Sequence, residues 1–299
     1  MPRLSILLPV KNGEGTIERA VRSTLRALPR DAALVVFDDA SSDSTAPILA
    51  GISDPRLSVQ SSADAAGVTG ALNHLLNHTD SEFVGRMDAD DVVLPWRFAF
   101  QRRMLADDQV CFTTVVEWTP ATRQIRPNFP KAISIAAFPY HLLLSNPVAH
   151  PTMFARRVVL ETVGGYRDVP AEDYDLWIRM QLAGASMRCA ALPGLLYRTH
   201  ATQVTASADW RRASWSNEET SLTFQELSTR LLGHPFFRLT TLSARSDLSA
   251  VEIDETLVRF ESAVKSASAK LTFVDRALLL HRLRSRLGSV RSSLTPPFC

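Results

Sequence analysis

The chain has 299 residues, enough for one large domain or for a domain with an appendage. Hydrophobic residues make up 45% of it and charged residues 21%, a composition typical of globular proteins that excludes disordered and fibrous classes. The formal net charge is only +2, so we expect no nucleic-acid partner, because proteins that bind nucleic acids generally have a marked basic excess.

The first half of the chain alternates short apolar runs with helical patterns. The predicted strands are residues 6–10, 34–37, 57–59 and 82–87. The predicted helices are residues 16–28, 44–51 and 70–77. Continuous apolar strands separated by helices are typical of a parallel sheet that is covered on both faces. The predicted fold class is therefore α/β, with a mostly parallel sheet flanked by helices.

The second half of the chain is more mixed. We predict strands at residues 110–117 and 152–155 and a helix at residues 174–183. From about Trp210 the spacing of apolar residues predicts mainly amphipathic helices. We therefore expect a sheet-based domain over residues 1–205 and a helical C-terminal extension over residues 206–299.

The sequence favours a cytoplasmic protein. The first apolar run is too short for a signal peptide, and no stretch approaches the roughly 20 apolar residues that span a bilayer. The three cysteines, Cys111, Cys189 and Cys299, are far apart and form no CxxC pair. They indicate neither a disulfide framework nor a cysteine zinc site, which fits a reduced compartment.

Acidic residues follow the predicted strands. Asp38 and Asp39 come after the second strand, and Asp88, Asp90 and Asp91 come after the strand that ends at Met87. Ligands of open parallel sheets bind outside the carboxyl ends of the strands, so we expect these acids to converge on one crevice. The alternative interpretation is that these aspartates cap helices or shape turns, as aspartates often do.

A crevice lined with carboxylates would repel the phosphates of a nucleotide unless a cation lay between them. Mg²⁺ or Mn²⁺ suits this position, because hard cations take oxygen ligands and bridge carboxylates to substrate phosphates. The segment around Gly13 lacks the third glycine of a dinucleotide fingerprint, since Glu18 stands at that position, and no GxxxxGK occurs. Binding of phosphates by a glycine-rich loop is therefore not expected.

Several motifs, taken together and in this order, resemble glycosyltransferase family 2, whose members have the GT-A type fold. They are Ser5-Ile6-Leu7-Leu8-Pro9-Val10-Lys11-Asn12-Gly13-Glu14, Phe37-Asp38-Asp39-Ala40-Ser41-Ser42-Asp43-Ser44-Thr45, Met87-Asp88-Ala89-Asp90-Asp91, Asn146-Pro147-Val148-Ala149-His150-Pro151-Thr152, Gly164-Gly165-Tyr166-Arg167 and Ala171-Glu172-Asp173-Tyr174-Asp175-Leu176-Trp177. The resemblance covers about the first 205 residues. Three features depart from the family pattern. Ala40 replaces a common glycine, Lys11 replaces a common aromatic, and Ala71-Leu72-Asn73 lacks an arginine that is often found beside the nucleotide.

The resemblance implies roles for individual residues. Five of them, Pro9, Val10, Glu14, Asp39 and Asp88, would bind the donor nucleotide. Asp90 would be the direct metal ligand, with Asp88 contacting the ribose or the same metal. Asp173 would be the catalytic base. Contacts with the acceptor or the diphosphate are expected from His150, Gly165, Tyr166, Glu172, Arg198 and His200.

The implied reaction is an in-line displacement at the anomeric carbon of a nucleotide sugar, with UDP-sugars as the favoured donors. Asp173 would remove the proton of the attacking hydroxyl. Its place at a helix start favours its negative charge. One displacement inverts the anomeric configuration, and the metal would neutralise the departing diphosphate. The Gln-x-x-Arg-Trp motif of processive relatives is absent around Gln203, which favours transfer of a single sugar.

Local alternatives remain open at several of these residues. An acid at a helix start often only stabilises the helix, and for Asp175 that structural interpretation is preferred. His150 could equally be a buried, hydrogen-bonded histidine. Trp177 is expected in the core because its neighbours are apolar, whereas Tyr166 is the better candidate for a sugar contact.

The C-terminal tail contains Arg276, Arg282, Arg284, Arg286 and Arg291 close to leucines. One interpretation is a basic amphipathic helix on the inner face of the membrane, which would suit a lipid-linked acceptor. The preferred interpretation is a solvated helix packed on the catalytic domain. Two other functional classes remain open, a sugar-phosphate nucleotidyltransferase and a non-catalytic nucleotide-binding scaffold.

Overall fold

The computed structural model describes residues 2–105, 108–127, 132–200, 203, 207–242, 244–245 and 247–294. The predicted domain boundary between residues 205 and 206 and the third cysteine, Cys299, lie outside this part of the chain. The chain divides into two compact units. Unit 1 comprises Met1–Ala132, Val148–Asp168 and Ala185–Ala201, and unit 2 comprises Ile133–Pro147, Val169–Gly184 and Thr202–Cys299.

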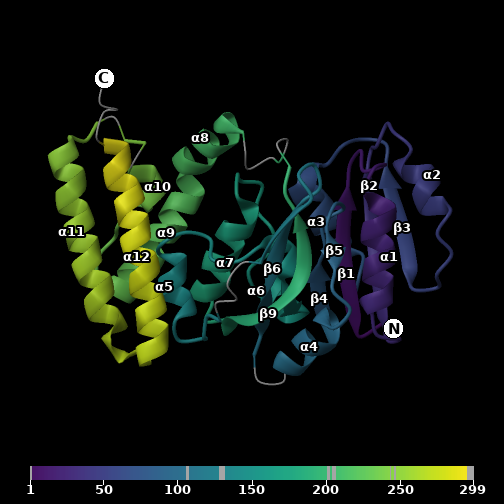
Figure 1. The fold of residues 1–299 in the computed structure, drawn as a ribbon, viewed down its shortest axis with the longest axis horizontal. Helices are drawn as coiled ribbons and strands as arrows, with labels where there is room; N and C mark the ends of the chain where they lie inside the picture. Colours follow the sequence, from purple (N-terminus) through teal and green to yellow (C-terminus); the bar gives the residue numbers. More distant parts are fainter. Residues whose placement is uncertain are drawn as a thin grey trace. The chain divides into compact units, whose positions relative to one another are not determined.

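Unit 1 is built on a sheet of nine strands within the described residues (Figure 1). The strands are β1 (Leu4–Val10), β2 (Ala32–Asp39), β3 (Leu57–Ser62), β4 (Phe83–Arg86), β5 (Val92–Val93), β6 (Val110–Thr119), β7 (Gln124–Pro127), β8 (Phe154–Arg156) and β9 (Met187–Arg198). Their order is β3-β2-β1-β4-β8-β6-β9-β5, with β7 paired to β6. Strands β3, β2, β1 and β4 are mutually parallel, as are β6 and β9, whereas β8 runs antiparallel to β4 and β6. The predicted α/β class with a mostly parallel sheet is confirmed.

Helices cover both faces of the parallel part of the sheet. The helices of unit 1 are α1 (Ile17–Ala27), α2 (Thr45–Ala50), α3 (Gly67–Asn77), α4 (Arg97–Met104) and α6 (Arg157–Thr162). Alternate residues of β1, from Leu4 to Val10, share one apolar cluster with residues of α1, α2 and α4. Helix α3 packs on β1 and β2, but its leucines are not part of that cluster, so it covers the opposite face. This arrangement explains why the strands are continuous apolar runs.

Unit 2 is helical, as the spacing of apolar residues predicts. Its helices are α5 (Phe138–Leu142), α7 (Glu172–Leu182), α8 (Ala208–Ser216), α9 (Glu218–Leu232), α10 (Leu239–Leu242), α11 (Ala250–Ala267) and α12 (Phe273–Leu294). Helix α12 packs on α10 and α11 and buries Leu279, Leu283 and Leu287, which are spaced four residues apart. Within the described residues no helix combines the length and the hydropathy that crossing a membrane would require.

Several elements, namely β5, β7, α4, α5 and α6, were not predicted from the sequence. Two further differences bear on the site. Strand β9 is unpredicted, because Pro193 and Gly194 interrupt it in the manner of a turn. They lie where the β6–β9 register shifts, and such irregularities accommodate proline and glycine in strands. Helix α7 begins at Glu172, two residues earlier than predicted, so Asp173 belongs to its first turn rather than preceding it.

Candidate active site

The loops that follow β1 and β2 are joined to each other by hydrogen bonds. These strands are parallel neighbours, so their carboxyl ends lie at the same edge of the sheet. The backbone N–H of Asn12 donates to Ser41 Oγ over 2.9 Å, and Asn12 Oδ1 accepts from the backbone of Ser42 over 2.9 Å. The backbone N–H of Gly13 donates to Thr45 Oγ1 over 2.8 Å. The two loops therefore form one wall beside the sheet edge.

Three residues predicted to bind the nucleotide lie in this wall or directly before it. Val10 is buried and Pro9 is half-buried at the end of β1. Glu14 is exposed, and its Oε2 accepts a hydrogen bond from the backbone of Ser44 over 3.0 Å. The Glu14 N–H in turn donates to Asp43 Oδ2 over 3.0 Å. The structure groups these residues, and their contacts with a nucleotide stay a prediction.

The paired aspartates at the end of β2 are engaged with the backbone. Both oxygens of Asp39 accept hydrogen bonds, from Ala66 N over 2.6 Å and from Gly67 N over 3.0 Å, where α3 begins. Asp38 Oδ1 accepts from Ser41 N over 3.1 Å. These are the capping and turn-shaping contacts that the alternative interpretation expects. A further hydrogen bond from Asp39 to a nucleotide base stays a prediction.

The turn after β2 is strained at Ala40. Its φ of 57° lies in the left-handed region. This conformation costs a residue with a side chain roughly 1–2 kcal/mol, a cost that glycine avoids. The geometry gives a reason why glycine is common at this position in the family that the sequence resembles.

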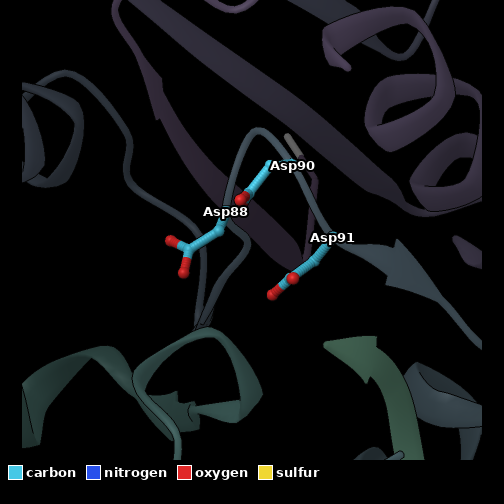
Figure 2. Close-up of side chains that lie close together, drawn as sticks. All are labelled: Asp88, Asp90 and Asp91. Carbon is cyan, nitrogen blue, oxygen red and sulfur yellow. The ribbon is translucent and has the colours of Figure 1, made fainter. Parts of the chain in front are cut away.

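The strongest cluster of acids lies in the loop between β4 and β5, here called the acid loop (residues 88–91). Asp88, Asp90 and Asp91 each offer a carboxylate oxygen, and these oxygens lie within 4.8 Å of one another. Figure 2 shows the three side chains extending from this one loop. Asp88 and Asp90 are half-buried, and Asp91 is 1% exposed. Sequence reasoning had assigned Asp88 and Asp90 to the metal but not Asp91, although it follows directly in the sequence.

The acid loop gathers three carboxylates at close range. Burial, and next the neighbouring carboxylate of Asp88, raise the pKa of Asp91 well above its usual value. A hydrogen bond of 2.8 Å from the backbone of Arg198 to Asp91 acts in the opposite direction. A set of carboxylate oxygens at this spacing fits a hard divalent cation such as Mg²⁺ or Mn²⁺. The acid loop is therefore the part of the described chain best suited to a metal.

Three basic residues contact the acid loop. Arg86, the last residue of β4, forms an ion pair with Asp88. His200 Nε2 lies 3.1 Å from Asp90 Oδ2, and Arg198 Nη1 lies 3.8 Å from the same oxygen. The structure thus brings Arg198 and His200, predicted to contact diphosphate or metal, beside the predicted metal ligand. Strand β9, which the sequence did not reveal, delivers both residues because it ends at Arg198.

A buried cation lies near the same acids. Arg97 of α4 is fully buried and donates hydrogen bonds to the backbone oxygen of Arg86 over 3.0 Å and to Gln101 Oε1 over 3.0 Å. Burial lowers the pKa of Arg97 to about 9, and the carboxylates of Asp91 and Asp88 act against that shift. Sequence reasoning missed this residue, because an arginine in a short segment with three arginines carries no signal of burial.

His150, Gly165 and Tyr166 occupy a packed part of unit 1. His150 Nε2 lies 3.0 Å from the Tyr166 hydroxyl, and these residues are 7% and 4% exposed. The Tyr166 backbone N–H donates to Asn73 Oδ1 over 2.9 Å. A side chain at Gly165, where φ is 69°, would come within 2.7 Å of that oxygen. The geometry favours the buried-histidine interpretation, and acceptor contacts by these three residues stay a prediction.

The predicted base lies in unit 2, at the start of α7. Ala171 precedes the helix with a φ of 61°, and Glu172 and Asp173 form its first turn. Asp173 Oδ2 accepts a hydrogen bond from Asn146 Nδ2 over 2.6 Å, and Asp173 Oδ1 accepts one from the backbone of Tyr174 over 2.6 Å. The carboxylate is therefore held by directed donors at a helix N-terminus. Asn146 belongs to a motif that resembles the family, but no role was predicted for it from the sequence.

Two neighbours of the predicted base are structural, as expected. Asp175 is 0% exposed, and its Oδ2 accepts from Arg179 Nε over 2.7 Å within the same helix. Trp177 is also fully buried. A buried ion pair and a buried indole hold α7 in the core of unit 2.

Comparisons with known proteins agree with this geometry. The model of the family described as "Glycosyl transferase family 2" matches residues 5–164. Putative glycosyltransferase EpsE of Bacillus subtilis (strain 168) is 29% identical over 192 residues, which cover 60% of this chain and 66% of that protein. The Escherichia coli UDP-Glc:alpha-D-GlcNAc-diphosphoundecaprenol beta-1,3-glucosyltransferase WfaP is 25% identical over 209 residues, covering 69% of this chain and 81% of that protein. The chain thus spans slightly less than two thirds of EpsE and most of WfaP.

Solved structures share the fold at low sequence identity. S. aureus TarS (residues 1–349), in complex with UDP-GlcNAc, superposes with a TM-score of 0.62 and 19% identity over 98% of this chain and 90% of that one. The mannosyltransferase PcManGT from Pyrobaculum calidifontis, in complex with GDP-Man and Mn²⁺, gives a TM-score of 0.56 and 19% identity over 98% of this chain and 85% of that one. These likenesses confirm the predicted GT-A type fold with its C-terminal helices.

Proposed function

Because the chain belongs to glycosyl transferase family 2, we propose that it is an inverting, metal-dependent, non-processive glycosyltransferase. It moves one sugar from a nucleotide-diphosphate sugar to an acceptor hydroxyl. UDP-sugars are the favoured donors, supported by the UDP-Glc in the name of WfaP and the UDP-GlcNAc bound to TarS. The favoured acceptor is a saccharide or a lipid-linked saccharide in the synthesis of cell-surface glycans, supported by the diphosphoundecaprenol acceptor in the name of WfaP.

The observation that carries this proposal is the acid loop at the carboxyl-terminal edge of a parallel sheet. Ligands bind at this edge in open α/β sheets. Asp88, Asp90 and Asp91 would hold Mn²⁺ or Mg²⁺, because their carboxylate oxygens lie together and hard cations take oxygen ligands. When bound, the metal would supply positive charge against the departing diphosphate.

Residues around the acid loop are assigned to the donor. Pro9, Val10, Glu14 and Asp39 line the nucleotide pocket in this proposal, supported by their common place at the ends of β1 and β2. Arg198 and His200 contact the diphosphate, supported by their short distances to Asp90. Both can donate hydrogen bonds to phosphate oxygens, provided that His200 presents an N–H.

Asp173 is the proposed general base. It takes the proton of the acceptor hydroxyl while that oxygen bonds to the anomeric carbon and the bond from this carbon to the diphosphate oxygen breaks. The first turn of α7 and the donors Asn146 and Tyr174 support this role, because both favour the charged carboxylate. The family match favours this reaction over the nucleotidyltransferase and scaffold alternatives.

The sequence also suggested a cytoplasmic location and a contact between the basic C-terminal helix and the inner face of the membrane. Both remain proposals. Arg291 Nε pairs with Asp254 Oδ1 over 2.8 Å within unit 2, and Arg282 contacts the segment 141–146. Arg286 is exposed on α12 and would be available to anionic headgroups.

A donor screen tests the proposed function. The intact protein is mixed with UDP-glucose, UDP-GlcNAc, UDP-galactose, GDP-mannose or ADP-glucose, each with Mn²⁺ or with EDTA. We expect a UDP-sugar in Mn²⁺ to raise the unfolding temperature, because a ligand at about 100 times its Kd stabilises a fold by about 2.7 kcal/mol. We also expect slow release of UDP from the same donor. ADP-glucose serves as the control. The proposal fails if folded protein responds to none of the UDP- or GDP-sugars in Mn²⁺.

A further inference from the structure

Arg282 of α12 reaches into unit 2, whereas Arg284, Arg286 and Arg291 of the same helix are exposed. It lies beside the buried stripe of α12, one position before Leu283. Its Nη1 donates to the backbone oxygen of His141 over 3.2 Å. Its Nη2 donates to Ser145 Oγ over 2.6 Å and to the backbone oxygen of Asn146 over 3.0 Å. One guanidinium thus binds His141 in α5 and both Ser145 and Asn146 in the segment that follows α5.

The same segment holds the predicted base. Asn146, whose backbone oxygen accepts from Arg282, donates its side-chain amide to Asp173 Oδ2 over 2.6 Å. All of these residues belong to unit 2, although they come from three distant parts of the chain. A continuous series of hydrogen bonds therefore connects the C-terminal helix to the Asp173 carboxylate.

The chemistry of Arg282 is costly for a residue that only packs a helix. Burial lowers its pKa to about 10, so it stays charged at neutral pH. The hydrogen-bond acceptors described for it are neutral oxygens and a histidine nitrogen, without the compensation of a carboxylate. A leucine would pack α12 without this cost. The rigid, planar donor fork suits the task of fixing a loop backbone.

We propose that Arg282 is a positioning residue for the reaction, which it serves by fixing Ser145 and Asn146 so that the Asn146 amide holds Asp173. This inference rests on the proposed role of Asp173 as general base. It gives the C-terminal helix a part in catalysis that is independent of any membrane contact. Loss of the Arg282 contacts with Ser145 and Asn146 would leave the donor site intact and misplace the Asp173 carboxylate.

The test measures UDP release from UDP-glucose in Mn²⁺, with water as the acceptor, in Arg282→Met, Arg282→Lys and Arg284→Met. The third variant is the control, because Arg284 is an exposed arginine on the same helix. We expect Arg282→Met to lower kcat by the order of 100-fold while the KM for UDP-glucose is unchanged, since a small misplacement of a catalytic group has effects of this size. Arg282→Lys should restore part of the loss, and Arg284→Met should match the unchanged chain. Calorimetric binding of UDP with Mn²⁺ gives the fraction of functional protein in each sample.

A double-mutant cycle asks whether Arg282 acts through Asn146. If it does, Arg282→Met adds little to the kcat loss of Asn146→Ala, because the two side chains belong to one series of contacts. If the kcat losses of Arg282→Met and Asn146→Ala multiply in the double variant, the inference is wrong. It is also wrong if Arg282→Met has the same kcat as the control. Should Arg282→Met not fold, Ser145→Ala removes the hydrogen bond between Arg282 and the Ser145 hydroxyl. This variant must lower kcat without changing KM.

The failure of this inference is distinguishable from the failure of the proposed function. If Asp173→Asn abolishes UDP release but Arg282→Met keeps it, the positioning role is wrong and the base assignment stands. If Asp173→Asn keeps full activity, the base assignment is itself wrong, and the positioning role falls with it.

Discussion

The acid loop of unit 1 and the first turn of α7 in unit 2 both present aspartates, but they treat the negative charge differently. In the acid loop three carboxylates crowd together, and burial with like charge raises the pKa of Asp91. At α7, Asp173 stands at a helix N-terminus and accepts directed hydrogen bonds from Asn146 and the backbone of Tyr174. The first arrangement suits a metal ion, whereas the second stabilises a single carboxylate.

This difference teaches that residue type alone does not assign a role. A crowded set of oxygens suits a metal, because a divalent ion balances several charges at once. A single oriented carboxylate suits proton transfer, which depends on a fixed distance and direction. Asp175, only two residues from Asp173, shows a third role, since it is buried in an ion pair with Arg179.

The largest effects should separate Asp173 from Asp175. We expect Asp173→Asn to lower kcat by about 10²–10⁴-fold with stability unchanged, because a general base contributes about that much. Asp175→Ala should instead cost about 3–5 kcal/mol of stability, since it removes the carboxylate of a buried ion pair. Urea unfolding and UDP release from UDP-glucose measure the two effects. Equal activity losses per folded molecule in both variants would contradict the distinction.

An effect of intermediate size should assign the metal to the acid loop. We expect Asp90→Asn to weaken Mn²⁺ binding at least about tenfold, because even residues that merely support a metal ligand contribute that much. Calorimetric titration of Mn²⁺ in the presence of UDP provides the measurement. Asp64→Asn, at an exposed aspartate of unit 1, is the matched control. If Asp173→Asn weakened Mn²⁺ binding and Asp90→Asn did not, the comparison between the two regions would be reversed.

The smallest effect should come from backbone strain at one alanine in each unit. Ala40 follows β2 with a φ of 57°, and Ala171 precedes α7 with a φ of 61°. Replacing either with glycine should stabilise the fold by up to about 1 kcal/mol, because relief of left-handed strain outweighs the entropy that glycine loses on folding. Ala263→Gly, within the regular helix α11, should destabilise by roughly 0.5–1 kcal/mol. Thermal unfolding of the three variants checks the signs, and a loss of stability in Ala40→Gly and Ala171→Gly would contradict the strain argument.

Much of the fold was predictable from the sequence, because its elements carry local signals. The apolar runs of β1 and β2 and the amphipathic spacing of α1 and α12 are such signals. Strand β9 was not predictable, since Pro193 and Gly194 look like a turn until β6 pairs across the irregular register. The residues it delivers, Arg198 and His200, were found through motif resemblance instead.

The candidate site was predictable as a set of residues but not as a set of contacts. The position of Asp88 and Asp90 after a buried strand was sufficient to indicate a metal site. Only the structure shows that Asp91 has a carboxylate oxygen close to those of Asp88 and Asp90. Arg282 was hidden in a basic run, and the buried leucines around it gave a weak signal that it borders the packed face of α12.

The amino-acid sequence alone determined the α/β class, the family and the acids that follow the parallel strands, because periodicity and strand–turn order are properties of neighbouring residues. Only the tertiary structure decided which partners those acids meet. It placed His200 beside Asp90, the start of α3 on Asp39 and Asn146 on Asp173. Such partners come from segments far apart in the chain, so the packing between these segments, rather than any local pattern, selects them.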